Sequence, residues 1–200
     1  MIPVAMQPEP ATFTAQVRNP GRAFLRHTPR PTKDEFDRHA YWSRCMPELR
    51  SGYSDVCAYL SSWIPTQASL DHFLPKSLYA IQAYEWSNYR LAHEKINNWK
   101  SKSTGVLDPF SVRAGWFVLD FASFFVNPAG ELQPHIADPI RHTISALHLN
   151  DDQFLKLRYN VLKDYSNRDT TLQFLQRRYP FIAAELQRQG RAETIVGTIT

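Results

Sequence analysis

The sequence predicts an α+β fold that is mainly α-helical. Apolar residues recur at helical spacing through much of the last third of the chain, and a Thr-x-x-Glu capping box at Thr32 marks an earlier helix. Between these regions lie short apolar pieces bounded by polar clusters, which are typical of short strands. With 200 residues, of which 43% are hydrophobic, the chain can bury its own core, and bulk disorder, collagen and coiled coil are excluded.

Targeting signals and cysteine content indicate the compartment. No apolar run approaches the roughly 18 residues that a transmembrane helix needs, so no membrane association is expected. The start, MIPVAMQPEP, lacks the basic and apolar regions of a secretory signal. Cys45 and Cys57 are too few for a disulfide framework, so we expect a reduced, cytoplasmic protein. The net charge of +4 is compatible with a polyanionic partner but does not require one.

The N-terminal part is expected to be an arm followed by a helix. Residues 1–31 contain six prolines, which fix φ and remove backbone donors, and therefore predict an extended Pro-rich arm. Thr32 and Glu35 form the capping box of the first helix, and Gly52 is its expected end. Apolar residues at helical spacing continue this segment: Trp42, Cys45, Met46 and Leu49.

The remaining elements follow in order. Short strands are expected at residues 69–73 and 89–92, then a helix over 93–102. Strands at 116–121 and 123–126 predict a hairpin, with a turn signal at 127–130. Three helical segments follow: a stripe of Ile136, Ile140, Ile144 and Leu147, a helix capped by Asn150 or Asp151, and a segment from Leu172 that closes at Gly190. The predicted division is 1–31 arm, 32–110 core, 111–190 hairpin and helices packed on the core, and 191–200 tail.

The residues that could carry chemistry lie between Leu70 and Lys100. Asp71 and His72 are adjacent, Asn88 follows in the intervening loop, and Asn97 and Lys100 lie one helical turn apart. A neutral imidazole suits a base that activates water for phosphodiester hydrolysis. Carboxylate and amide oxygens are hard ligands that suit Mg²⁺ or Mn²⁺. An asparagine in the loop could pin the backbone that carries the histidine.

The order D-H…N…N-x-x-K resembles the HNH endonucleases, whose motif is a ββα-metal finger. The resemblance implies that His72 is the general base, that Asp71 and Asn97 bind the metal, and that Asn88 braces the loop, so that His72, Asn88 and Asn97 form the catalytic set. It places the finger between an N-terminal helix and the C-terminal hairpin and helices. The strings CAYLSSWIP, YEWSNYRLA and VLDPF extend the likeness loosely over 57–110.

These flanking strings resemble a bacterial, ATPase-associated subgroup of HNH proteins, such as the nuclease subunit of Septu-type anti-phage systems. The resemblance implies Mg²⁺ or Mn²⁺ as cofactor, nucleic acid as substrate with DNA favoured over RNA, an ATPase partner and a role in antiviral defence. Lys76, Arg90 and Lys100 would contact phosphates, although a solvated helix face explains them equally well. A structural zinc is not expected, because two of its four ligand positions hold Leu60 and Ile96.

Two other functions stay open. The missing zinc ligands are compatible with a non-catalytic HNH-like binding or adaptor module, whose helical C-terminal part would dock a partner. An RNA- or tRNA-directed toxin nuclease would carry the same site residues. Nucleotide binding by this chain itself is not expected, because the sequence has no G-x-x-x-x-G-K-[ST] loop and only seven glycines.

Overall fold

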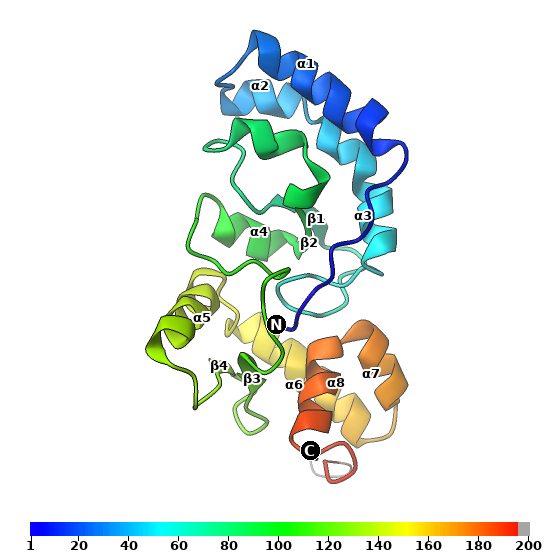
Figure 1. The fold of residues 1–200 in the computed structure, drawn as a ribbon. Helices are drawn as coiled ribbons and strands as arrows, with labels where there is room; N and C mark the ends of the chain where they lie inside the picture. Colours follow the sequence, from blue (N-terminus) through cyan, green and yellow to red (C-terminus); the bar gives the residue numbers. More distant parts are fainter. Residues whose placement is uncertain (196–200) are drawn as a thin grey trace. The chain divides into compact units, whose positions relative to one another are not determined.

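The computed structural model describes residues 1–195 and confirms a mainly helical α+β fold with two small antiparallel sheets (Figure 1). The chain divides into two compact units. The N-terminal unit comprises Ala5–Cys57 and Ile64–Thr104, and the C-terminal unit comprises Met1–Val4, Ala58–Trp63 and the chain from Gly105 onward. After α4 (Glu94–Lys100), the chain passes from the first of these units to the second at residues 104–105. Within residues 1–195, every helix falls short of the length and hydropathy needed to cross a bilayer.

The N-terminal unit holds the first ten elements of the chain. In order they are η1 (Thr14–Arg18), α1 (Asn19–His27), α2 (Lys33–Arg38), η2 (Tyr41–Cys45), α3 (Met46–Gly52), β1 (Ala68–His72), η3 (Ala80–Tyr84), η4 (Trp86–Asn88), β2 (Tyr89–His93) and α4 (Glu94–Lys100). Here η1 is a π-helical turn, and η2, η3 and η4 are 3₁₀ helices.

The predicted extended arm is wrong for the second half of residues 1–31. Thr14 to His27 is helical, because Pro20 lies in the first turn of α1, where a missing N–H is tolerated. The preceding turn is widened to π geometry, with the Asn19 N–H bonded to Thr14 O. Phe13, Val17 and Phe24 are buried, so this helix is part of the core of the N-terminal unit.

The helix predicted from Thr32 is confirmed at its start and divided further on. Thr32 Oγ1 accepts from the Glu35 N–H, and Glu35 Oε2 accepts from the Thr32 N–H at 2.7 Å, which completes the capping box of α2. The helix ends at Arg38, and η2 and α3 carry the rest of the predicted apolar stripe. α3 ends at Gly52, as predicted.

A strand–strand–helix segment forms the middle of the N-terminal unit. β1 and β2 pair antiparallel, with Asp71 opposite Arg90 and His72 opposite Tyr89. The chain passes from β2 directly into α4, which lies beside both strands (Figure 1). The strands and the helix predicted from the sequence are confirmed to within two residues at each end.

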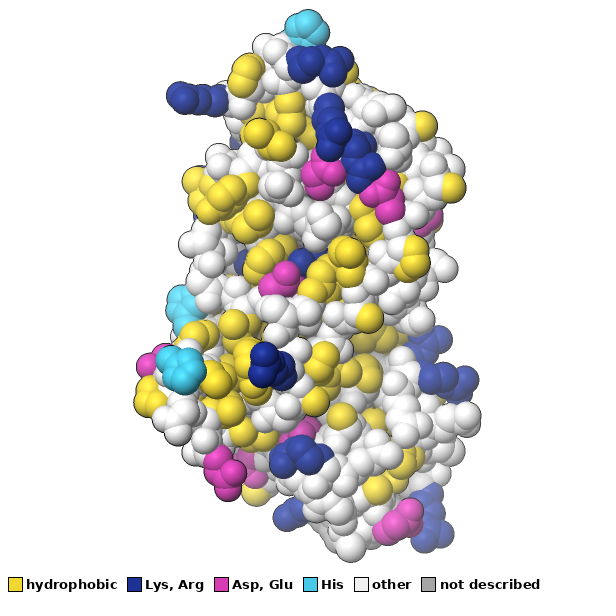
Figure 2. Space-filling model, in the orientation of Figure 1, with side chains coloured by type: hydrophobic (Ala, Val, Ile, Leu, Met, Phe, Trp, Pro, Cys, Tyr) yellow, Lys and Arg dark blue, Asp and Glu magenta, His cyan; other side chains and the backbone are white. Residues whose placement is uncertain are grey.

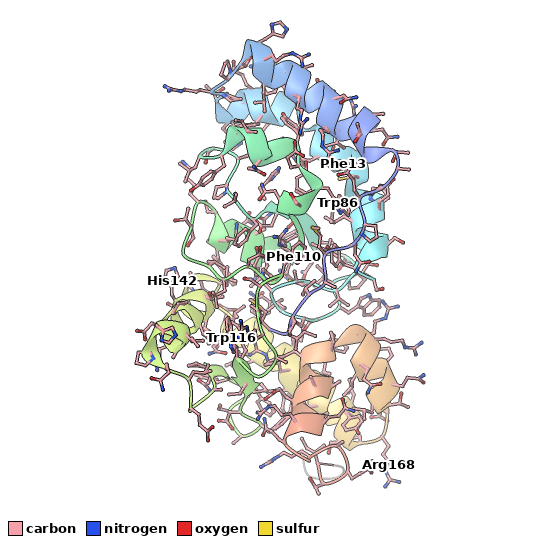
Figure 3. The ribbon with its side chains drawn as sticks, in the orientation of Figure 1. Phe13, Trp86, Phe110, Trp116, His142 and Arg168 are labelled. Atoms are coloured by element: carbon pink, nitrogen blue, oxygen red, sulfur yellow. The ribbon has the colours of Figure 1, made fainter. Side chains whose placement is uncertain are left out.

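Aromatic rings pack this segment against the preceding helices. Phe13 and Trp86 lie side by side, with ring centroids 5.6 Å apart (Figure 3), and Phe13 contacts Tyr89 at 5.7 Å. Trp86 Nε1 donates to Gln7 O at 2.8 Å. Tyr84, which is fully buried, packs on Gly21 of α1. The edge-to-face geometry of these rings contributes a favourable interaction in addition to the free energy gained from the apolar area that they bury.

Gly21→Ala tests the packing of α1 on Tyr84. A Cβ at Gly21 would overlap the Tyr84 ring, so we expect the substitution to lower the free energy of unfolding by about 1–3 kcal/mol. Denaturant unfolding monitored by tryptophan fluorescence measures the change. Gly130→Ala is the matched control, because its Cβ would meet no atom within 4 Å. A Gly21→Ala protein as stable as the Gly130→Ala protein would show that α1 does not pack there.

Up to residue 195, the C-terminal unit contains a hairpin and four helices. Its elements are β3 (Phe117–Leu119), β4 (Val126–Pro128), α5 (Pro134–Ala146), α6 (Asp152–Ser166), α7 (Leu172–Arg178) and α8 (Pro180–Arg188). Asp151 caps α6, as one of the two alternatives predicted, by accepting from the Gln153 N–H. Gly190, with φ +64°, follows α8 where the close of the helix was predicted. Of the predicted tail, residues 196–200 lie outside the described residues.

The turn of the predicted hairpin is at a different place. β4 contains Asn127 and Pro128, which were expected in the turn. The turn instead follows Asp120, whose carboxylate accepts from the Ala122 N–H at 2.9 Å and the Ser123 hydroxyl at 2.6 Å. An Asp that bonds the backbone two residues on forms an Asx turn, which is a stronger local signal than the Asn-Pro pair.

Candidate active site

His72 is the last residue of β1 and lines a cavity of about 480 Å³ in the N-terminal unit. Asp71, Lys76 and Asn97 line the same cavity. The other lining residues are Pro31, Lys33, Phe36, Leu70, Pro75, Ser77, Asn98, Ser101 and Lys102. Four of the residues singled out from the sequence therefore meet at one hollow, because the last turn of α4 lies against the end of β1.

Backbone contact fixes the imidazole of His72. Nε2 lies 2.9 Å from Ala83 O, and a carbonyl can only accept, so Nε2 carries the proton in the neutral ring. Nδ1 then holds the lone pair. Trp42 and Tyr89 pack edge-to-face on the ring, at 4.8 and 5.3 Å between centroids. The ring is thus held in one tautomer and one orientation.

The surroundings of His72 keep the imidazole neutral. His72 is 8% exposed. Its burial, and to a lesser extent the nearby Lys76 ammonium, lowers the pKa of His72 to about 3. Because the pKa in the folded protein lies below the unfolded value, stability from this group is complete above about pH 6.5 and is lost as the pH falls towards 3. The imidazole of His72 is therefore neutral across the physiological range.

A prediction about pH follows from this pKa if the protein carries out the phosphodiester hydrolysis expected from its sequence. If His72 acts as the base, we expect the single-turnover rate at saturating metal to change less than about twofold between pH 8 and pH 5. A histidine with an ordinary pKa would lose about 30-fold over that range, because its neutral fraction falls to a few per cent. Quenched-flow or gel assays across the range measure the profile. A fall centred near pH 6.5 would show that this imidazole is not the base.

Asn88 holds the loop between the two strands. Its Nδ2 donates to Leu74 O and Gln82 O, both at 3.0 Å, and its Oδ1 accepts from the Leu74 N–H at 2.7 Å. Its backbone carbonyl accepts from the Phe73 N–H at 2.9 Å. The side chain is buried and lies outside the cavity lining. It therefore fixes the turn that follows His72 and takes no direct part in the cavity.

Asn88→Ala is expected to loosen this loop. The change leaves two carbonyls and one N–H without their partner, so we expect the free energy of unfolding to fall by about 2–4 kcal/mol. Asn98→Ala, an exposed asparagine of α4, is the matched control with an expected change within about 0.5 kcal/mol. Equal unfolding midpoints for the two variants would contradict the bracing role.

Asp71 is buried and paired with Lys100. Lys100 Nζ lies 3.0 Å from Asp71 Oδ1, 3.0 Å from His72 O and 2.9 Å from Phe73 O. The side chains of Asp71 and Lys100 are 3% and 0% exposed. An ammonium has three protons, and these three acceptors can take all of them. α4 thus fastens the end of β1 through a lysine at its last residue.

Asn97 projects from α4 onto β1. Its Nδ2 lies 3.2 Å from both Ser69 Oγ and Leu70 O. With the amide nitrogen bonded to the strand, Oδ1 is the remaining acceptor of a side chain that lines the cavity. Asn97 and Asp71 therefore line one hollow, and the hydrogen bonds to β1 use the amide nitrogen of Asn97, not its oxygen.

The expected phosphate contacts need correction. Lys76 lines the cavity, with its ammonium 5.2 Å from the Trp42 ring centroid. Lys100 is fully buried on the acceptors described above and cannot reach a phosphate. Arg90 is 3% exposed, and its Nη1 donates to Ser87 O and Tyr89 O. The acceptors of Lys100 belong to β1 and the residue that follows it, about 28 positions earlier in the chain, whereas those of Arg90 are its near neighbours.

Cys57 and His93, at two of the four positions where a structural zinc would need ligands, make other contacts. The Cys57 thiol accepts from the His93 N–H at 3.3 Å. His93 caps α4 by accepting from the Lys95 N–H, and its Nε2 lies 2.6 Å from Gln67 Oε1. Within residues 1–195, no three His, Cys, Asp or Glu side chains gather as a metal cluster of their own. A Mg²⁺ or Mn²⁺ ion in the cavity fits a different donor set: one carboxylate, one amide oxygen, water and substrate phosphate.

Three contributors to the site were missed by sequence reasoning. Ala83 acts through its carbonyl, which no residue pattern reveals, and Trp42 packs on the His72 ring from η2. Lys33 of α2 lines the cavity from a segment distant in sequence, where its ammonium also pairs with Asp37 at 2.5 Å. For Lys33, the nearest signal in the sequence was the general excess of basic residues.

Comparison with known proteins adds no further assignment. No protein-family model matches this chain, and no curated protein shows a significant sequence match to it. The function is therefore inferred from the residues around the cavity and their geometry.

Proposed function

We propose that this protein is a metal-dependent endonuclease of the HNH type that hydrolyses phosphodiester bonds of nucleic acid. The observation that carries this proposal is the geometry of His72. Its Nε2–H is fixed on Ala83 O, so Nδ1 keeps the lone pair, and His72 lines a cavity that Asp71 and Asn97 also line. A base and two hard oxygen donors side by side are the groups that hydrolysis of a phosphodiester requires.

In the proposed mechanism His72 removes a proton from water at Nδ1. The water oxygen forms a bond to phosphorus while the bond from phosphorus to the leaving oxygen breaks, and the Ala83 carbonyl steadies the imidazolium through Nε2–H. Asn88 keeps the turn after His72 fixed, so that the ring does not shift during the step. A divalent cation held by Asp71 and Asn97 would supply stabilisation of the charge on the phosphate and the leaving oxygen.

Basic and apolar side chains beside the cavity favour nucleic acid as the substrate. Lys76 lines both this cavity and a neighbouring one of about 630 Å³, which Arg30 also lines. Exposed Leu78, Tyr79 and Ile81 belong to that second cavity. Figure 2 shows Lys and Arg side chains (dark blue) and hydrophobic ones (yellow) together over α1 and α2 of this unit. Such a surface suits phosphates flanked by sugars and bases.

On the basis of its resemblance to ATPase-associated HNH proteins, we also propose a role for this protein in the cell. We place the protein in the bacterial cytoplasm as a nuclease effector of antiviral defence, with DNA as its substrate and an ATPase as its regulatory partner. Its own sequence holds no Walker A loop, so nucleotide control would have to come from another chain. Co-expression with an ATPase encoded beside it, followed by co-purification, tests the partnership.

Incubation of the purified protein with supercoiled plasmid tests the activity. Parallel reactions contain Mg²⁺, Mn²⁺ or EDTA, and a matched set contains a structured RNA in place of the plasmid. We expect nicking that requires the divalent cation and is absent with EDTA. Cleavage of RNA alone would replace DNA with RNA as the substrate and point to the toxin nuclease.

The second candidate is a non-catalytic adaptor module. The pairing of Lys100 with Asp71 favours it, because the ammonium already supplies a positive charge where a metal would otherwise be needed. An adaptor would leave plasmid and RNA intact under every metal while forming a stable complex with a partner chain. The plasmid assay on a protein shown to be folded therefore separates the two candidates.

A further inference from the structure

The Asp71–Lys100 pair changes the charge of the candidate metal site. Among the described residues that line the cavity, Asp71 is the one acidic side chain, while Lys33, Lys76 and Lys102 are basic. Lys100 lies directly behind Asp71 and offsets its charge. A divalent cation entering this cavity in the free protein would meet a carboxylate that is already paired with a buried ammonium.

Lys100 is held in place by more than Asp71. Its ammonium also donates to the carbonyls of His72 and Phe73, so it cannot swing away without leaving two buried acceptors unsatisfied. Its side chain is 0% exposed. The positive charge beside Asp71 is therefore a permanent part of the site in the folded protein.

We infer that this pair makes metal binding depend on substrate: the divalent cation and the nucleic acid bind cooperatively, and Lys100 weakens metal binding in the free protein. A phosphate in the cavity adds negative charge and oxygen ligands, which the cation needs because Asp71 alone is offset. By linkage, the cation strengthens nucleic-acid binding by the same factor. This inference rests on the proposed nuclease function and adds that the substrate phosphate completes the metal site.

The consequence is a nuclease that holds little metal until it meets its substrate. Lys100 is a positioning residue in this scheme, because it acts through Asp71 and the carbonyls that follow. The Asp71–Lys100 pair thereby limits unproductive metal chemistry in the free protein without a conformational change.

Titration with Mn²⁺, followed by the EPR signal of the free ion, tests the coupling. The protein carries His72→Ala, so that an intact DNA duplex or a single-stranded RNA can be added without cleavage. We expect Mn²⁺ affinity to rise at least about tenfold when the polymer that the wild-type protein cleaves is present. This comparison is made within one protein, with and without polymer, and uses no change at Lys100; thermal unfolding must first show that the His72→Ala protein is folded.

Lys100→Met then identifies the cause of the coupling. We expect it to raise Mn²⁺ affinity in the polymer-free protein about tenfold and to shrink the gain on adding polymer. Lys102→Met is the matched control, because it removes an exposed lysine of the same cavity that has no contact with Asp71 among those described. It is expected to leave Mn²⁺ affinity of the polymer-free protein within about twofold while weakening polymer binding.

The outcomes separate this inference from the proposed function. Mn²⁺ affinity that is the same with and without bound polymer, in a protein whose wild type cleaves it, overturns the coupling and leaves the nuclease intact. Equal effects of Lys100→Met and Lys102→Met would remove the special role of the buried pair. Absence of both cleavage and polymer binding would overturn the nuclease proposal, and the inference with it.

Discussion

His72→Ala is expected to reduce metal-dependent cleavage by about 10²–10⁴-fold, the range that a positioned general base contributes. The reason is geometric as well as chemical. The Ala83 carbonyl and the rings of Trp42 and Tyr89 hold one tautomer of the imidazole in one place, and alanine leaves no group that can take a proton from water there. Initial rates of plasmid nicking at saturating Mn²⁺ measure the loss.

His135→Ala is the matched control for this variant. His135 is exposed in α5 of the C-terminal unit, so its removal is expected to leave the rate within about twofold of wild type. Because His72 is buried, thermal unfolding of both variants must show that each is folded at the assay temperature. A folded His72→Ala protein that nicks plasmid as fast as His135→Ala would remove His72 from the mechanism.

Asp71→Asn is expected to act on cleavage and on stability together. The change removes the carboxylate charge from the cavity, so we expect metal-dependent cleavage to fall at least about 100-fold. It also leaves the Lys100 ammonium buried without its counter-charge, which should lower the free energy of unfolding by about 2–4 kcal/mol. Asp37→Asn, which breaks the exposed pair with Lys33, is the control and should leave the unfolding midpoint nearly unchanged.

A double variant separates the two effects of Asp71→Asn. Adding Lys100→Met removes the unpaired charge, so we expect much of the lost stability to return while cleavage stays absent. If cleavage returned together with stability, Asp71 would be a structural residue and the proposed metal ligand would be wrong. Urea unfolding and plasmid nicking supply both measurements, on the wild type, Asp71→Asn, Lys100→Met and the double variant.

Local signals in the sequence predicted the elements whose determinants are neighbours in the chain. The Thr32–Glu35 capping box began a helix because both partners lie within one turn. β1, β2 and α4 were found because their apolar alternation and polar boundaries are local. The same reasoning failed at Pro20, where the proline count indicated extended chain but the position of one proline in a first turn permits a helix.

The residues of the candidate site likewise fall into those whose place was predicted from the sequence and those whose place only the tertiary structure shows. The adjacency of Asp71 and His72 and the spacing to Asn97 gave three residues that line one cavity, because a hairpin and a following helix bring such positions together by short connections. Lys100 was expected to contact phosphate, as a lysine beside such a motif often does. It is buried because α4 closes over the end of β1, where a carboxylate and two carbonyls accept its protons.

The sequence by itself determined the fold class, the strand–strand–helix order and the set of side chains that could carry hydrolysis. Only the tertiary structure decided the tautomer of His72, the neutralisation of Asp71 and the burial of Arg90 and Lys100. The physical reason is that residue type and spacing specify what a side chain can donate or accept. Its actual partners are backbone carbonyls and charges from segments far along the chain, and these are assigned only when the chain packs.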